Sequence, residues 1–84
     1  NGYKYSKLCR NKYFSIDKYI IETCYEGKSD KEAFQIITCV EGEGTIEGND
    51  YREVINKGDS FLLPATLGVY KIKGNLELLL SKSL

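Results

Sequence analysis

The sequence predicts an all-β fold, a sandwich or barrel of about seven short strands in a single domain over residues 1–84. Two observations predict it. Runs rich in β-branched and aromatic residues alternate with period two rather than 3.6, and turn residues separate these runs at short intervals. No segment has a convincing helical pattern, and 84 residues suffice for one small core and no more.

Two strands are expected in the first half of the chain. Phe14–Ile21 reads FSIDKYII and Phe34–Val40 reads FQIITCV. In the first strand, alternation places on one face Phe14, Ile16 and Ile20. In the second, it separates Phe34, Ile36, Thr38 and Val40 from Gln35, Ile37 and Cys39. Between them, Ser29–Phe34 forms either one helical turn after a Ser or Asp cap or an acidic loop.

Turn residues punctuate the second half. We expect a turn at Glu41–Gly44, a hairpin loop at Gly48–Asp50 and another turn at Asn56–Asp59. The strands SFLL, VYKIK and LELLLS follow, and Gly74-Asn75 should separate the last two. The only proline, Pro64, directly follows SFLL, and proline is confined to strand ends, edges and bulges. It therefore predicts a corner between two strands.

The composition excludes several function classes. Twelve basic and twelve acidic residues balance, so nothing suggests binding to nucleic acid or an anionic membrane. No apolar run is long enough to span a membrane, and the N-terminal residues lack a signal-peptide core. The chain has no histidine, the usual general base near neutral pH and the commonest metal ligand.

The cysteines indicate the cellular compartment. The chain has three, Cys9, Cys24 and Cys39, and no CxxC motif. An odd number without such a motif favours reduced thiols in a cytoplasmic protein. Since the chain also lacks methionine, even at its start, we expect a piece of a longer polypeptide or a processed chain.

Two local motifs favour structural roles. GEGTIEG is followed by β-type residues rather than by the helix that a dinucleotide loop requires, so we interpret it as a tight turn. The tyrosines of GYKY, Tyr3 and Tyr5, could stack on a ligand, but more often such residues cover a partner surface or dock a terminus.

A pair of spaced motifs resembles the cupin superfamily. Gln35, at the place of that family's glutamate, is followed after six residues by Gly42, and Gly58 is followed after five by Pro64. The resemblance implies a small antiparallel jelly-roll barrel of about seven or eight strands. Gly58 would open a turn and Pro64 would close a strand at the barrel mouth.

The same resemblance shows where this chain departs from metal-binding cupins. Their two early histidines correspond to positions within Lys28, Ser29, Asp30 and Lys31, and their later histidine corresponds to Val69. Thr66 replaces a glycine. Because an amide, lysines and a valine stand in place of imidazoles and a carboxylate, we expect no metal in this chain. No residue is assigned as catalytic, cofactor-binding or metal-binding.

A closer resemblance covers nearly the whole chain. LCRNKYFSIDKYII, FQIITCVEGEGTIE, INKGDSFLLPATLGVYKIKG and the ending ELLLS resemble the C-terminal domain of bacterial-type class I mannose-6-phosphate isomerases. The resemblance implies a parent enzyme that interconverts mannose 6-phosphate and fructose 6-phosphate. It also implies a zinc ion held by histidine, glutamate and glutamine in the preceding N-terminal catalytic domain. None of those ligand positions lies in this segment.

We therefore expect a structural role, in which this domain packs against the catalytic domain of the same polypeptide. The isolated chain should be inactive, with sugar phosphate bound only in the intact enzyme, and self-association of the fragment stays open. The alternative is a metal-free sensor that binds a sugar or another small ligand at the barrel mouth, near Pro64–Tyr70 and Gln35.

Overall fold

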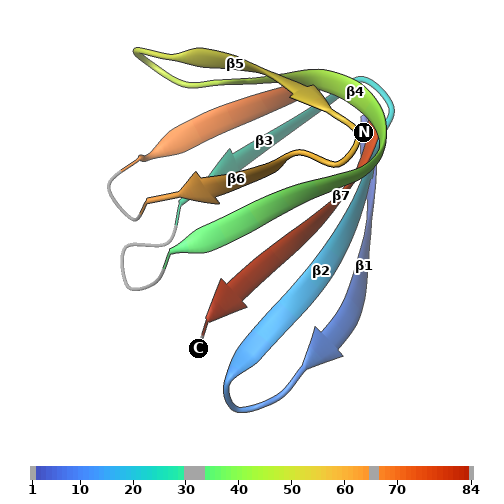
Figure 1. The fold of residues 1–84 in the computed structure, drawn as a ribbon, viewed down its shortest axis with the longest axis vertical. Coiled ribbons are helices and arrows are strands. Elements are labelled where there is room, and N and C mark those ends of the chain that lie inside the picture. The colour runs from blue at the N-terminus through green and yellow to red at the C-terminus, as the bar shows by residue number, and fades with distance from the viewer. Residues whose placement is uncertain (1, 30–33, 65–66, 84) are drawn as a thin grey trace.

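In the described residues, 2–29, 34–64 and 67–83, the computed structural model has seven β-strands and no helix (Figure 1). The strands are β1 (Tyr3–Arg10), β2 (Phe14–Ile21), β3 (Cys24–Lys28), β4 (Gln35–Glu47), β5 (Arg52–Asn56), β6 (Ser60–Leu63) and β7 (Val69–Ser83). The predicted all-β class is confirmed. Nothing in these ranges is a helix long and apolar enough to cross a membrane.

The strands form two layers because β4 and β7 are long and each takes part in both. The first half of β4 pairs with β6 and with the second half of β7, which continues the sheet to β2 and β1. We call this β1–β2–β7–β4–β6 arrangement the long layer. The second half of β4 pairs with β5 and with the first half of β7, which also pairs with β3. This β3–β7–β4–β5 arrangement is the short layer.

Every ladder is antiparallel, as the predicted jelly roll requires. The sheet is not closed, however: among the described residues no ladder joins β5 to β6 or β1 to β3. Figure 1 shows β5 and β6 diverging from the turn that connects them. The fold is therefore an open, cupin-like jelly roll.

Glycines bend β4 and β7 where the two strands pass from one layer to the other. The turns expected at Glu41–Gly44 and at Gly74-Asn75 are wrong, because both segments lie inside continuous strands. Gly42 and Gly74 take positive φ angles of 79° and 132°, and Gly44 lies opposite Gly74. These backbones can bend together while keeping their cross-strand pairing, so two strands serve both layers.

The other turn predictions are confirmed. At Asn56–Asp59, the Asn56 backbone N–H donates to Asp59 Oδ2 at 2.8 Å, and the Asp59 N–H donates to the Asn56 carbonyl at 3.0 Å. Gly58 takes a positive φ of 93° in this turn. β6 ends directly before Pro64, as the corner prediction requires. At the β4–β5 hairpin, the Gly48 N–H donates to the Tyr51 carbonyl at 3.0 Å.

Two strands were missing from the sequence prediction, β1 and β3. Every residue of β1 is exposed, so no alternation of buried and exposed positions marks it as a strand. β3 has only five residues and contains Gly27. The segment 30–33, which carries most of the predicted helical turn or acidic loop, lies outside the described residues.

The core lies between the layers. It consists of Ile21, Ile37, Cys39, Ile46, Ile55, Leu63, Tyr70, Ile72, Leu76, Leu78 and Leu80. In β4 the predicted alternation is confirmed, since Gln35, Ile37 and Cys39 are buried. In β2 the buried residues are Ser15 and Ile21, so the face that carries Phe14 and Ile16 points away from the core.

Candidate functional site

The structure describes only some of the positions that correspond to cupin metal ligands, namely Lys28, Ser29, Gln35 and Val69. Lys28 ends β3 and pairs with Val69 at the start of β7. Val69 is 51% exposed, whereas its neighbour Tyr70 is 2% exposed. Because side chains alternate along a strand, Tyr70 rather than Val69 points into the core at this end. The position matched to the later histidine thus faces outward and carries an alkyl group.

Gln35, at the place of the cupin glutamate, lies on the inner face. Its side chain is buried, and its Oε1 atom has no hydrogen-bond partner among the described residues. Asp30, Lys31 and Thr66 lie outside those residues. Among the described residues, these positions supply one amide, one hydroxyl that already accepts from the Gly68 N–H, one ammonium and one alkyl group. This is a poor donor set for a divalent cation, which takes several oriented donors, so the described residues do not fit a cupin metal.

A reciprocal contact fixes the end of the predicted barrel mouth. The Ser29 N–H donates to the Gly68 carbonyl at 2.9 Å, and the Gly68 N–H donates to Ser29 Oγ at 2.8 Å. Gly68 has a positive φ of 83°. The residue after β3 is thereby held against the segment that enters β7, and Ser29 is buried there.

The tyrosines of the N-terminal strand dock β1 onto the fold. The rings of Tyr3 and Tyr25 meet edge to face with centroids 4.7 Å apart, and those of Tyr5 and Tyr19 lie 5.2 Å apart. Tyr5 Oη donates to Asp17 Oδ1 at 3.0 Å, and this hydrogen bond raises the pKa of Tyr5. Burial is the main cause of the raised pKa of Tyr19. These contacts support the docking interpretation of GYKY over ligand stacking.

The three cysteines are unpaired and differ in accessibility. Cys9 is exposed, Cys24 is half-buried and Cys39 is buried in the core. Cys39 Sγ donates to the Glu41 carbonyl at 3.3 Å, and burial raises the pKa of this thiol. A raised pKa lowers the thiolate fraction, so Cys39 has the character of a structural residue rather than of a nucleophile. Within the described residues no cluster of Cys, Asp and Glu could hold a metal ion.

An apolar surface lies on the outside of the long layer. Cross-strand pairing aligns Ile16 with Ser81, Ser81 with Ile36, and Ile36 with Leu62. Directly opposed residues of neighbouring strands project on the same face, so this row is continuous across β2, β7, β4 and β6. Phe14 lies two residues before Ile16 on β2 and therefore projects on the same face.

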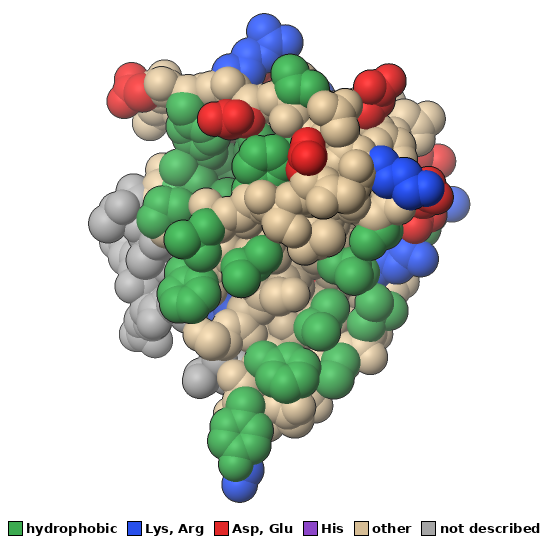
Figure 2. Space-filling view, viewed as in Figure 1, with side chains coloured by type: hydrophobic (Ala, Val, Ile, Leu, Met, Phe, Trp, Pro, Cys, Tyr) green, Lys and Arg blue, Asp and Glu red, His purple; other side chains and the backbone are tan. Residues whose placement is uncertain are grey.

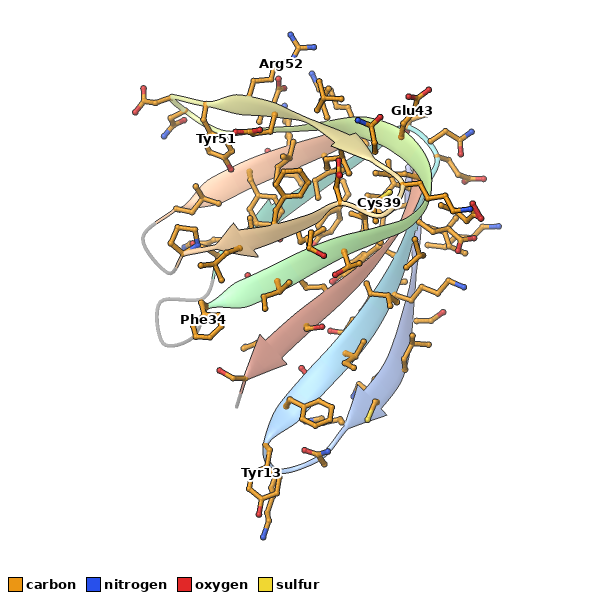
Figure 3. The ribbon with its side chains drawn as sticks, in the orientation of Figure 1. Tyr13, Phe34, Cys39, Glu43, Tyr51 and Arg52 are labelled. Atoms are coloured by element: carbon orange, nitrogen blue, oxygen red, sulfur yellow. The ribbon has the colours of Figure 1, made fainter. Side chains whose placement is uncertain are left out.

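Together with Phe34, these residues form a surface that we call the outer apolar face, consisting of Phe14, Ile16, Phe34, Ile36 and Leu62. A shallow hollow of about 230 Å³ lies within it, lined mainly by its aromatic and isoleucine side chains. Phe34 is 52% exposed and Leu62 is 61% exposed. Figure 2 shows hydrophobic side chains on this side of the molecule, and Figure 3 places Phe34 at the start of β4. Contiguous exposed apolar surface is typical of a contact with another protein surface.

Known proteins match this chain over nearly its whole length. The family model "Mannose-6-phosphate isomerase, cupin domain" matches residues 4–83. The mannose-6-phosphate isomerase ManA of Bacillus subtilis (strain 168) is 36% identical over 69 residues, which are 82% of this chain and 22% of the relative. This chain therefore spans about a quarter of the length of the curated relatives it matches.

Solved structures agree with the family match. The crystal structure of the mannose 6-phosphate isomerase from Bacillus subtilis aligns with a TM-score of 0.85 at 32% identity, covering 95% of this chain and 25% of that one. An RmlC-like cupin protein from Desulfovibrio desulfuricans aligns with a TM-score of 0.81 at 16% identity, covering 96% of this chain and 81% of that one, which supports the fold alone. The chain belongs to the cupin-domain family of mannose-6-phosphate isomerases.

Proposed function

We propose that this chain is the accessory cupin domain of a cytoplasmic mannose-6-phosphate isomerase. The whole enzyme would interconvert mannose 6-phosphate and fructose 6-phosphate with a zinc ion held in a preceding catalytic domain. The family match and the greater length of the relatives support this proposal. The chemistry of the chain supports it too, since an aldose–ketose proton transfer needs a base and a group that polarises the carbonyl. The chain has no histidine, and its cupin ligand positions carry Gln35, lysines and Val69.

The role that the domain has in this enzyme is to pack against the rest of the polypeptide. The outer apolar face is the observation that carries this assignment. Burying one large apolar side chain that is now exposed contributes about 1.5–3 kcal/mol, so several such residues on one face favour a stable contact with another domain. The face extends across four neighbouring strands in the order β2, β7, β4 and β6.

Substitution of Phe34 tests the packing role in the intact isomerase. Phe34→Asp should destabilise the contact between the domains, because it places a carboxylate in an interface that is apolar. The contact between the domains should become weaker by about 1.5–3 kcal/mol. We therefore expect a melting temperature lowered by several degrees and faster limited proteolysis between the domains. The isolated 84-residue chain should keep its stability, since Phe34 is 52% exposed in it.

The matched control is Val69→Asp, at a residue that is 51% exposed on the opposite layer. It should leave both the intact enzyme and the isolated chain nearly unchanged. Equal effects of the two substitutions in the intact enzyme would contradict the assignment of the outer apolar face as the interface.

The division of chemistry between the domains has its own test. The purified 84-residue chain should contain no stoichiometric zinc and should not convert mannose 6-phosphate, while the intact enzyme should lose activity on chelation and regain it with zinc. Elemental analysis and a coupled isomerase assay measure both. One zinc ion per isolated chain, or turnover that survives chelation and repurification, would show that this domain carries the catalytic groups itself.

A further inference from the structure

A pocket lies between β5 and β6, where the fold is open. β5 pairs with Glu43–Glu47 of β4, whereas β6 pairs with Gln35–Thr38, on the other side of the β4 bend. The two strands therefore diverge after their connecting turn and leave a hollow of about 280 Å³. We call it the β5–β6 pocket. Its lining includes Ile46, Tyr51, Glu53, Phe61, Leu63 and Leu67.

The Tyr51 hydroxyl is the unusual group in this pocket. It is buried and has no hydrogen-bond partner among the described residues. Buried hydroxyls are nearly always hydrogen-bonded, because one that loses water without gaining a partner destabilises the fold. Burial also raises the pKa of Tyr51, so the group stays a neutral phenol that can donate one hydrogen bond and accept others.

The hairpin loop keeps this side chain in the pocket. A β-carbon built on Gly48 would lie only 2.9 Å from Tyr51 Cζ, so the absence of a side chain at Gly48 gives the ring its place. The Gly48 N–H also donates to the Tyr51 carbonyl at 3.0 Å, which fixes the backbone of the loop. Figure 3 shows Tyr51 at the end of the β4–β5 hairpin, on the side that faces β6. The ring is therefore held in the wall of the pocket, with its unpartnered hydroxyl covered.

Size and charge define the kind of molecule that fits. An engineered apolar cavity of about 150 Å³ is known to hold a benzene molecule, so the β5–β6 pocket has room for one ring and a short substituent. Its walls are aliphatic and aromatic, Glu53 is exposed at the rim, and its lining among the described residues includes no lysine or arginine. A carboxylate at the rim of an otherwise apolar pocket disfavours anions, and sugar phosphates are therefore poor candidates.

We propose that the β5–β6 pocket binds a small single-ring molecule, neutral or positively charged, whose polar group hydrogen-bonds with the Tyr51 hydroxyl. This site goes beyond the packing role of the domain. It lies at the β5–β6 opening and excludes the anionic substrate class of the isomerase, so its ligand would be a second, chemically distinct one.

Three probes that share a phenyl ring test the proposal on the 84-residue chain: benzylamine, benzyl alcohol and benzoate. In titrations followed by ¹H–¹⁵N NMR, benzylamine and benzyl alcohol should shift the amide signals of Tyr51, Leu63 and Leu67. Benzoate should bind about fivefold more weakly than benzylamine, the size expected for a rim charge. Absence of shifts with all three probes, or tightest binding of benzoate, would overturn the proposal.

Tyr51→Phe isolates the hydroxyl. It should weaken benzyl alcohol binding about five- to tenfold, the usual worth of one neutral hydrogen bond, without lowering the urea midpoint of the free chain. Tyr13→Phe, at a residue 67% exposed at the tip of the β1–β2 hairpin, is the matched control and should change neither quantity. Unchanged binding, or a lowered midpoint, would mean that the hydroxyl serves the fold and would contradict the site.

Glu53→Gln tests the charge preference at an exposed position where folding is not at risk. It should bring the affinities of benzylamine and benzoate within about twofold of each other. If the preference for benzylamine persists in this variant, Glu53 does not determine the charge preference of the pocket. The pocket borders the outer apolar face, since Leu62 belongs to both. None of these measurements depends on isomerase activity or on the contact between domains, so a failure of the pocket proposal is distinguishable from a failure of the packing role.

Discussion

Replacing Gly42 with alanine will destabilise the domain by about 2–4 kcal/mol, a large part of the stability of a chain this short. Two effects combine at this position. Gly42 has a positive φ of 79°, which strains any residue with a β-carbon, and that β-carbon would also collide with the Asn75 carbonyl oxygen of the facing strand. Because the Asn75 carbonyl and the Gly42 main chain are both backbone, neither can move aside without disturbing the β4–β7 ladder.

Two further glycines separate the two effects. Gly58 has a positive φ of 93° with open space around it, so Gly58→Ala should cost only about 1 kcal/mol of conformational strain. Gly44 does not have a positive φ, but a β-carbon there would meet the Lys73 carbonyl oxygen, so Gly44→Ala measures the collision alone. Urea unfolding of the three variants gives the comparison. If Gly42→Ala costs no more than Gly58→Ala, the close approach of β4 and β7 is not what requires glycine.

These glycines also mark where sequence interpretation failed. Glycine beside polar residues is typical of a chain reversal, so Glu41–Gly44 and Gly74-Asn75 were interpreted as turns. The structure uses the same residues to bend two strands together. What distinguishes a bend from a reversal is the partner, and Gly44 faces Gly74, thirty residues later in the chain. A local pattern contains no information about that pairing.

The features that were predictable depend on local chemistry. The turn at Asn56–Asp59 closes with its own side-chain and backbone hydrogen bonds, and Pro64 ends β6 because it cannot donate to a ladder. β1 was not predicted because its position depends on distant residues rather than on local chemistry. Tyr3 and Tyr5 contact tyrosines of β3 and β2, while both faces of β1 remain exposed.

The candidate sites also combine features that local sequence predicts with features that depend on distant strands. Alternation along β4 correctly separated Gln35 from Phe34 and Ile36, but it did not indicate which of the two faces is buried. Part of the β5–β6 pocket lies where the sequence suggested a ligand could bind, because Pro64 and Leu67 belong to the Pro64–Tyr70 segment of the predicted barrel mouth. The contribution of Tyr51 could not be foreseen, because it depends on the place where β4 changes layers and separates β5 from β6.

Ile72→Ala should lower the free energy of unfolding by about 2–5 kcal/mol, the range for deleting a large aliphatic side chain from a core. Ile72 is 0% exposed and lies in β7 between Tyr25 of β3 and Ile46 of β4. Its neighbours come from two ladders on opposite sides, so they cannot easily collapse into the cavity. Since 1 kcal/mol shifts the melting temperature of a small domain by several degrees, we expect a decrease of about 10 °C or more.

Val69→Ala is the control on the same strand, and it also tests which way β7 faces. Val69 is β-branched like Ile72 but 51% exposed, so its truncation should change stability by no more than about 0.5 kcal/mol. Thermal unfolding of the two variants gives both values. A loss at Val69 as large as that at Ile72 would mean that Val69 points into the core, where the cupin alignment places a ligand. The outward position of Val69, on which the exclusion of a metal partly depends, would then be wrong.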